Sequence, residues 1–108
     1  MSLKESKFET EAERALDRLV ESIDDLEDDA LEAELESGVL SIRFQDGTKF
    51  VVNSHRAARQ IWMAAGPVAW HFDLGEDGRW VASKSGDELF STVSRQTSTK
   101  LGRSVQLG

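Results

Sequence analysis

Carboxylates are the side chains of this sequence with the most evident chemistry, and they are concentrated at one end. Residues 1–36 hold 14 of the 20 Asp and Glu but 4 of the 13 Lys and Arg, a net charge of −10. Residues 37–108 carry 6 acids and 9 bases, a net charge of +3. The densest stretch is Asp24-Asp25-Leu26-Glu27-Asp28-Asp29. Such a surface repels nucleic acid and anionic membranes, and it attracts cations and basic protein patches.

Metal binding by these residues would use oxygen ligands, because the sequence has no cysteine. Oxygen ligands suit hard or borderline metal ions, and the lack of thiols excludes a disulfide scaffold, a CxxC redox site and a thiolate-held cluster. The acidic run also lacks the central Gly and the ligand spacing of a calcium loop. Open carboxylates without a cage bind metals weakly, so we expect several loose sites rather than one tight site.

The acidic positions work against helix stability. Glu21/Asp25, Asp24/Asp28 and Asp25/Asp29 would be like-charge pairs at i, i+4, each costing about 0.2–0.5 kcal/mol. Anions near a helix C-terminus are also disfavoured by the macrodipole. A sequence selected for stability alone would place Lys or Arg there, which favours a functional interpretation. The alternative is a solvated face that raises solubility.

Two amphipathic helices are predicted at the two ends of the sequence. Ser6 and Glu9 have the spacing of a capping box, and apolar residues at helical spacing follow, which predicts a helix over about residues 6–27. Ser85 and Glu88 form a second such pair, which predicts a helix over about 86–101 ending at Gly102. Residues 103–108 are expected to form a tail.

Short strands with alternating polarity occupy about residues 32–82. Leu40, Ile42 and Phe44 alternate with polar residues, and Asp46-Gly47 is a strong hairpin signal. Strands of this kind bury one face, which the two helices can cover. The sequence therefore predicts a single α+β domain over residues 1–108. Its architecture would be a two-layer sandwich, with both terminal helices on one face of an antiparallel sheet of five or six strands.

The uncovered face of that sheet, here called the open face, is predicted by strand parity. If Phe50, Ile61 and Phe72 point to the helices, their neighbours at odd spacing point to solvent. An exposed Trp among amide and imidazole groups is typical of a contact anchor. A register slip of one residue would instead bury Trp62 and expose Ile61 and Met63. The residues expected together on the open face are Asn53, Gln60, Trp62 and His71.

Other function classes find little support. No Ser–His–Asp arrangement can be argued, and Gly66-Pro67 and Gly75–Gly78 have the composition of turns rather than of a phosphate-binding loop. His55 is expected to be an ordinary surface residue in a polar loop. No apolar run approaches the roughly 20 residues of a membrane span, and the N-terminus lacks signal or transit features. These features favour a cytoplasmic binding protein, although a mature organellar protein without its presequence would look the same.

The strand residues carry a family resemblance. Val52-Asn53, then Gln60-Ile61-Trp62, a Gly-Pro turn, Trp70-His71-Phe72-Asp73 and Trp80-Val81 resemble the frataxin family, above all its bacterial CyaY branch. The resemblance runs from about Phe8 to Leu101 and includes the acidic first helix. The sequence departs from eukaryotic members at Ala69, where they have a basic residue, and from many bacterial ones at Trp70, where Tyr is frequent.

The resemblance implies an iron-binding regulator or iron donor in iron–sulfur cluster assembly that docks on the cysteine desulfurase–scaffold complex. It implies weakly bound Fe2+ or Fe3+, no organic cofactor, and a monomer that iron could assemble into oligomers; weak ferroxidase-type activity is compatible with it. The matching docking residues are Asn53, Gln60 and Trp62, and parity adds His71. The implied iron ligands, here called the acidic ridge, are Glu13, Asp17, Glu21, Asp24, Asp25, Glu27, Asp28, Asp29, Glu32 and Glu34.

One alternative belongs to another class. An acidic adaptor or nucleic-acid mimic would bind a basic protein and have no connection with iron. Such a mimic needs the acids alone, whereas the frataxin-like interpretation also needs a neutral aromatic patch.

Overall fold

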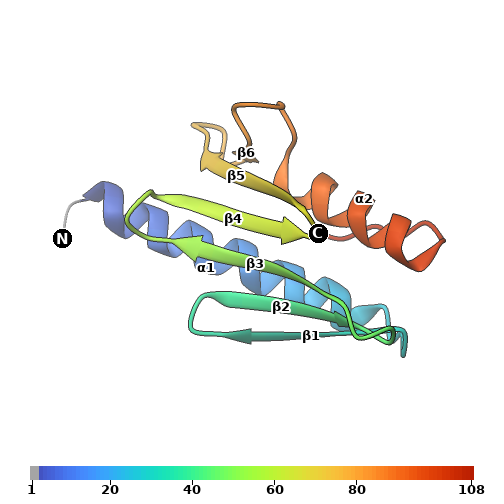
Figure 1. The fold of residues 1–108 in the computed structure, drawn as a ribbon. Coiled ribbons are helices and arrows are strands. Elements are labelled where there is room, and N and C mark those ends of the chain that lie inside the picture. The colour runs from blue at the N-terminus through green and yellow to red at the C-terminus, as the bar shows by residue number, and fades with distance from the viewer. Residues whose placement is uncertain (1–2) are drawn as a thin grey trace.

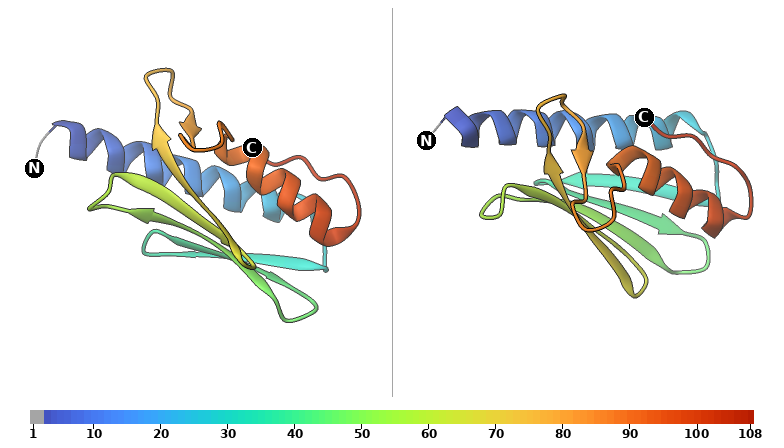
Figure 2. Two further views of the ribbon diagram at one scale, coloured as in Figure 1. Left: turned by 45° about the horizontal axis from the view of Figure 1, so that its top comes forward. Right: turned by 90° about the horizontal axis from the view of Figure 1, so that it is seen from above.

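Two helices cover one face of a six-stranded antiparallel sheet in the computed structural model, which describes residues 3–108 and the side chains from residue 5 onward (Figures 1 and 2). The strands follow one another across the sheet in sequence order, so every connection is a short turn. This arrangement confirms the predicted two-layer α+β fold. The elements are α1 (Leu3–Asp25), β1 (Leu31–Glu36), β2 (Val39–Phe44), β3 (Lys49–His55), β4 (Gln60–Ala65), β5 (Val68–Leu74), β6 (Trp80–Val81) and α2 (Leu89–Leu101).

The core lies between the sheet and the helices. Alternate strand residues such as Ile42, Val52 and Ile61 are completely buried, and Leu19 and Val93 cover them from α1 and α2. Burying apolar surface in this way is the main stabilising term of the fold. The predicted inward parity of β2–β5 is therefore confirmed.

The bounds of α1 differ from the prediction. The helix begins at Leu3, so Ser6 lies inside the helix and does not cap it. Leu, Lys and Glu at positions 3–5 are good helix formers, and nothing there breaks the pattern. The helix ends at Asp25, and Glu27 takes a left-handed φ of 48°. Of the three predicted like-charge pairs, Glu21/Asp25 is therefore the one that lies on the helix.

The start of α2 also differs from the prediction. Glu88 is itself the N-cap, and its carboxylate accepts hydrogen bonds from the Phe90 N–H (2.8 Å) and the Ser91 N–H (3.0 Å). Ser85 instead accepts from the Asp87 N–H (3.3 Å) in the preceding turn. A glutamate that caps directly shifts the helix start to Leu89. Gly102 ends the helix as predicted, with a left-handed φ of 72°.

Residues 103–108 pack against both helices and are not a free tail (Figure 2). Val105 and Leu107 are buried. The Val105 N–H donates to the Ser98 hydroxyl (2.8 Å), and the Leu107 N–H donates to the Ser94 hydroxyl (2.9 Å). The Gly108 N–H then donates to the Ser22 Oγ of α1 (3.0 Å). The segment therefore adds two apolar side chains to the core.

Candidate functional site

The helical part of the acidic ridge lies on the solvent side of α1. Glu13, Asp17 and Glu21 follow one another at i, i+4 spacing, so they share one face of the helix. All three are exposed, as are Asp24 and Asp25 at the end of the helix. Within residues 5–108 none of these five carboxylates makes an ion pair or a hydrogen bond. They are open to solvent cations.

Two ridge residues have partners within the protein. Asp28 is half-buried, its Oδ1 accepts a hydrogen bond from the Ala30 N–H (2.8 Å), and it forms an ion pair with Arg103. Glu34 forms an ion pair with Arg43 (2.8 Å), and this hydrogen bond and charge raise the pKa of the Arg43 guanidinium. Asp28 and Glu34 are thus occupied by protein cations, unlike the carboxylates of α1.

The strand part of the ridge, on β1, faces the open face of the sheet rather than the helix side. Leu31, Ala33 and Leu35 of β1 turn toward the core, so the alternating Glu32 and Glu34 turn to the open face. Since β1 is an edge strand, the ridge wraps around this edge from α1 to the open face. In the part of the chain that the structure describes, no three Asp, Glu or His side chains converge to hold a metal ion.

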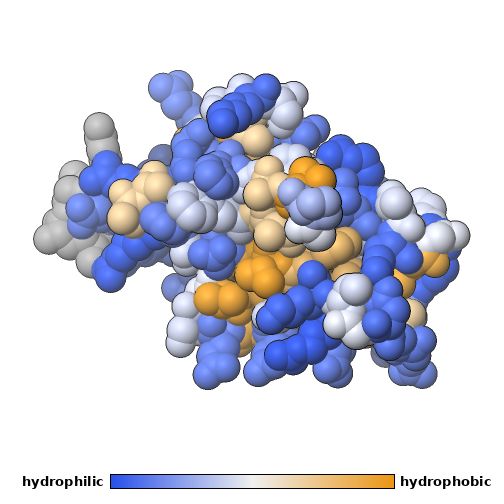
Figure 3. All heavy atoms as spheres, viewed as in Figure 1, coloured by the Kyte–Doolittle hydropathy of each residue, from blue (hydrophilic) through white to orange (hydrophobic). Residues whose placement is uncertain are grey.

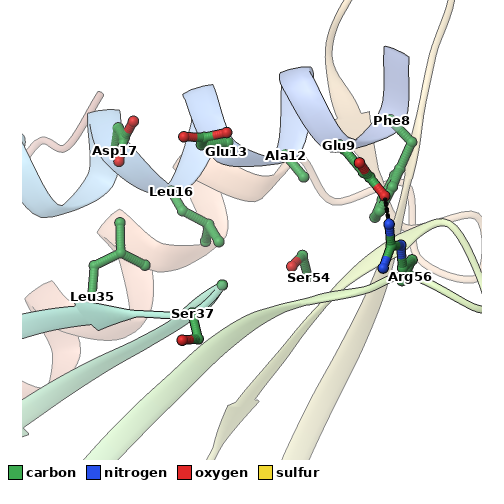
Figure 4. A pocket seen from close by; sticks show the side chains of 11 residues that line it. Phe8, Glu9, Ala12, Glu13, Leu16, Asp17, Leu35, Ser37, Ser54 and Arg56 are labelled. Carbon is green, nitrogen blue, oxygen red and sulfur yellow. Dashed lines mark ion pairs between the residues drawn. The ribbon is translucent and has the colours of Figure 1, made fainter. Parts of the chain in front are cut away.

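A pocket of about 560 Å3 lies beside the ridge, between α1 and the ends of β1 and β3 (Figure 4). Glu13 and Asp17 lie along its helix side, and Leu16 and Leu35 form its apolar wall. The ion pair between Glu9 and Arg56 closes one end (Figure 4). The pocket places two unpaired carboxylates next to apolar surface.

The open face is organised in rows, because directly paired residues of neighbouring strands lie side by side. Trp62 pairs with Asn53 of β3 and with His71 of β5, and it is half-exposed. Ile61 and Met63, on either side of it, are buried. The predicted register is therefore confirmed, and the one-residue slip is excluded. The complete row across the sheet is Glu36, Val39, Asn53, Trp62 and His71.

His55 also belongs to this face, contrary to the prediction that it is a loop residue. It is the last residue of β3, and its ring stacks on Trp62 with a centroid distance of 3.7 Å and an interplanar angle of 16°. His71 stacks on the same indole at 4.3 Å and 14°. His55 is two residues after Asn53, so parity would have placed it on the open face if the strand had been extended by two residues.

Hydrogen bonds connect the polar groups of the face. The Trp62 indole N–H donates to the Gln60 Oε1 (2.8 Å), and the Gln60 amide donates to an Asp73 oxygen (3.0 Å). The predicted set of Asn53, Gln60, Trp62 and His71 is thus brought together by three adjacent strands. The indole N–H already has a partner within the protein, so Trp62 offers ring surface on this face rather than a vacant donor.

The middle of the open face is apolar. Figure 3 shows hydrophobic residues gathered at the centre of this side of the molecule, with hydrophilic ones around them. Val39, which pairs with Asn53 on this face, is 40% exposed. Val51, Ala64 and Ala69 form a row of small side chains next to the Trp62 row. A face of this kind, neutral and partly apolar, is typical of a protein contact surface.

A family model described as a frataxin-like domain matches residues 1–103. The chain belongs to the frataxin family. Among its relatives is the iron-sulfur cluster assembly protein CyaY of Azotobacter vinelandii, 36% identical, with 98% of this chain and 96% of the relative covered. The protein of the same name from Ralstonia pickettii is 37% identical, with 97% and 95% covered.

Solved frataxins share the architecture of this frataxin-family chain. Frataxin from Psychromonas ingrahamii superposes with a TM-score of 0.86 at 22% identity, covering 94% of this chain and 95% of that one, which is a likeness of fold. Trimeric frataxin from Saccharomyces cerevisiae, complexed with ferrous iron, has a TM-score of 0.74 at 26% identity, covering 86% and 87%. Over residues 3–108, none of the helices is long and apolar enough to span a membrane.

Proposed function

We propose that this frataxin-family protein acts in iron–sulfur cluster assembly, where it binds iron weakly and docks on the cysteine desulfurase–scaffold complex. The observation that carries the proposal is the pairing of two surfaces. One is a row of unpaired carboxylates on α1, and the other is a neutral aromatic face centred on Trp62. The names of the relatives, iron-sulfur cluster assembly protein CyaY, support the same role.

Iron is cargo or effector in this proposal, and the chemistry of the donors fits it. Carboxylate oxygens are hard ligands that accept Fe2+ and Fe3+. The α1 carboxylates are exposed and not preorganised, so affinity and selectivity are low and several sites share the metal. The yeast relative complexed with ferrous iron is consistent with iron as the metal.

Docking uses the open face for apolar contact and the ridge for attraction. The ridge and the open face meet at β1, where Glu32 and Glu34 share the face with Trp62. A basic partner would therefore be steered by the acids and held by the aromatic centre. The proposal also includes a cytoplasmic location and assembly into trimers with iron. In cluster assembly the protein would act either as an iron donor or as a regulator.

The test is cluster assembly on the scaffold, measured with and without this protein over a range of iron concentrations. We expect the protein to change the assembly rate, with a size or sign that depends on iron. A rate that is the same with and without the protein at every iron concentration would overturn the proposal. The acidic mimic predicts the same null result, together with strong binding to unrelated basic proteins that Trp62→Ala leaves unchanged.

A further inference from the structure

The Trp62 indole is held between two imidazoles. His55 comes from β3 and His71 from β5, and these strands lie on opposite sides of β4, which carries Trp62. The two rings therefore cover opposite faces of the indole, both nearly parallel to it. What remains for a partner is the edge of the ring.

The His55 ring is itself held in place by a hydrogen bond. His55 Nδ1 accepts a hydrogen bond from the Ala58 N–H (3.3 Å) in the turn between β3 and β4. An acceptor at Nδ1 places the imidazole proton of the neutral ring on Nε2. The backbone of the turn thus fixes the orientation in which His55 meets Trp62.

The indole is also fixed along its length. Its N–H is bonded to Gln60, and Gln60 is bonded to Asp73, so rotation of the indole would break a chain of two hydrogen bonds. A half-exposed Trp ordinarily loses side-chain freedom when it enters an interface, and that loss weakens binding. Here the freedom is already restricted in the free protein.

We propose that His55 is a positioning residue of the docking face: with His71 it holds the Trp62 indole on edge, preformed for a narrow apolar slot in the partner. The inference rests on the proposed function, in which the open face docks on the desulfurase–scaffold complex. His55 orders the indole, and the indole makes the contact. The slot must be apolar because the indole N–H is bonded to Gln60.

The experiment compares His55→Ser, which removes the stacked ring, with His55→Phe, which keeps a ring but loses the Ala58 hydrogen bond. Lys84→Ser, in the exposed turn after β6, is the matched control. In the free protein, 15N relaxation of the Trp62 Nε1–H reports the order of the indole. Affinity for the purified desulfurase–scaffold complex is then measured for the same variants, together with melting temperature.

We expect His55→Ser to lower the order of the Trp62 indole and to weaken docking by about 3- to 10-fold, with a folded domain. His55→Phe should restore most of the order and the affinity, and Lys84→Ser should change neither. If His55→Ser leaves the indole equally ordered, His55 does not position Trp62, whatever the docking affinity. If the indole loses order while docking is unchanged, and Trp62→Ala still weakens docking, the positioning role is wrong. If Trp62→Ala also docks normally, the proposed docking face is wrong, and the positioning role fails with it.

Discussion

At the scale of single residues, Trp62 combines exposure with order. It covers none of the core, its two faces lie against His55 and His71, and Ile61 and Met63 beside it make the core contacts of β4. The side chain with the largest apolar surface on the open face is therefore one that folding hardly needs. Large aromatic side chains in such positions dominate the affinity of protein interfaces.

We therefore expect Trp62→Ala to lower the melting temperature by no more than a few degrees and to leave iron binding intact. Docking on the desulfurase–scaffold complex should weaken at least about tenfold, which corresponds to about 1.4 kcal/mol. Thermal unfolding and partner affinity, measured side by side, check this. An unfolded variant would mean that the indole carries core packing, and normal docking would mean that the partner uses another surface.

Asp25 and Asp28 are close in sequence but differ in their surroundings. Asp25 is exposed at the C-terminal end of α1, one turn after Glu21, and α1 has no basic residue in its last turn. Asp28 accepts a hydrogen bond from the Ala30 N–H and forms an ion pair with Arg103.

Asp25→Lys should thus raise the free energy of unfolding by about 0.5 kcal/mol, because it removes the repulsion with Glu21 and places a cation at the negative end of the helix macrodipole. Asp28→Lys should lower it by about 1–3 kcal/mol, because a bonded carboxylate is lost. Urea denaturation of the two variants measures both changes in the free energy of unfolding. A stabilised Asp28→Lys variant would contradict the argument.

At the scale of elements, a charged contact connects α2 to the β2–β3 hairpin. Lys100 of α2 forms an ion pair with Asp46 in the turn (2.5 Å), and Asp46 also accepts hydrogen bonds from the Thr48 hydroxyl (2.6 Å) and N–H (2.9 Å). Lys100, and after it Thr48, hold the pKa of the Asp46 carboxyl well below its ordinary value of 3.8. Because the pKa is lowered in the folded state, Asp46 stabilises the fold at pH values above 3.8, and this contribution decreases as the pH falls toward the folded-state pKa.

Asp46→Asn should therefore melt at a lower temperature than the unmodified protein at pH 7. The difference should shrink as the pH falls below 3.8, because the unfolded chain then takes up a proton on Asp46 while the folded protein still holds the charge. Melting curves between pH 2 and pH 7 check the sign, with Glu76→Gln, an exposed carboxylate in the β5–β6 turn, as the control. A difference that is constant over this range would mean that the charge of Asp46 does not contribute.

The segment after α2 belongs to the helix layer. Val105 and Leu107 are 6% and 4% exposed, and the Arg18 guanidinium donates to the Gly108 carbonyl oxygen (2.9 Å). Replacing both apolar side chains by Ser should lower the free energy of unfolding by about 2–5 kcal/mol. The open face is on the other side of the sheet, so the folded variant should dock normally. Denaturant unfolding and partner affinity test the two statements separately, and unchanged stability would show that the segment contributes little to the core.

At the scale of the whole molecule, charge and apolar contact are arranged around the β1 edge. The sequence has a net charge of −7, and its acids gather on α1, the following turn and β1. Charge attraction over such distances is screened by salt, with a Debye length of about 10 Å at 0.1 M and about 3 Å at 1 M. Attraction of a basic partner by the ridge should therefore fade as salt rises, whereas the Trp62 contact should persist.

Iron should act on the same part of the molecule. We expect added Fe2+, or a diamagnetic substitute, to shift NMR signals within residues 13–34 and to leave α2 unchanged. The shifts should be larger at Glu13, Asp17 and Glu21 than at Asp28 and Glu34, which are paired with Arg103 and Arg43. Divalent cations should also raise the melting temperature by bridging the repelling carboxylates. Shifts centred on His55 or on α2 would place the metal elsewhere.

The sequence by itself determined the features that depend on local periodicity. A period of 3.6 placed the apolar stripe of α1, and a period of two placed Trp62, Asn53 and His71 on one face of the sheet. The register of β4 followed as well, because a slip would have exposed Ile61 and Met63. Gly102 as the end of α2 is another local feature, since few other residues accept a left-handed φ.

Tertiary structure decided the features that join distant segments. The ion pair of Asp28 with Arg103 and the packing of Leu107 in the core depend on where turns and chain ends come to lie. No periodicity encodes such contacts, because each depends on the relative placement of elements that the core fixes. The acidic ridge shows both levels. The acidic residues of the ridge can be read directly from the sequence. Its division into free carboxylates on α1 and ion-paired ones at Asp28 and Glu34 arises only when folding brings Arg103 and Arg43 to them.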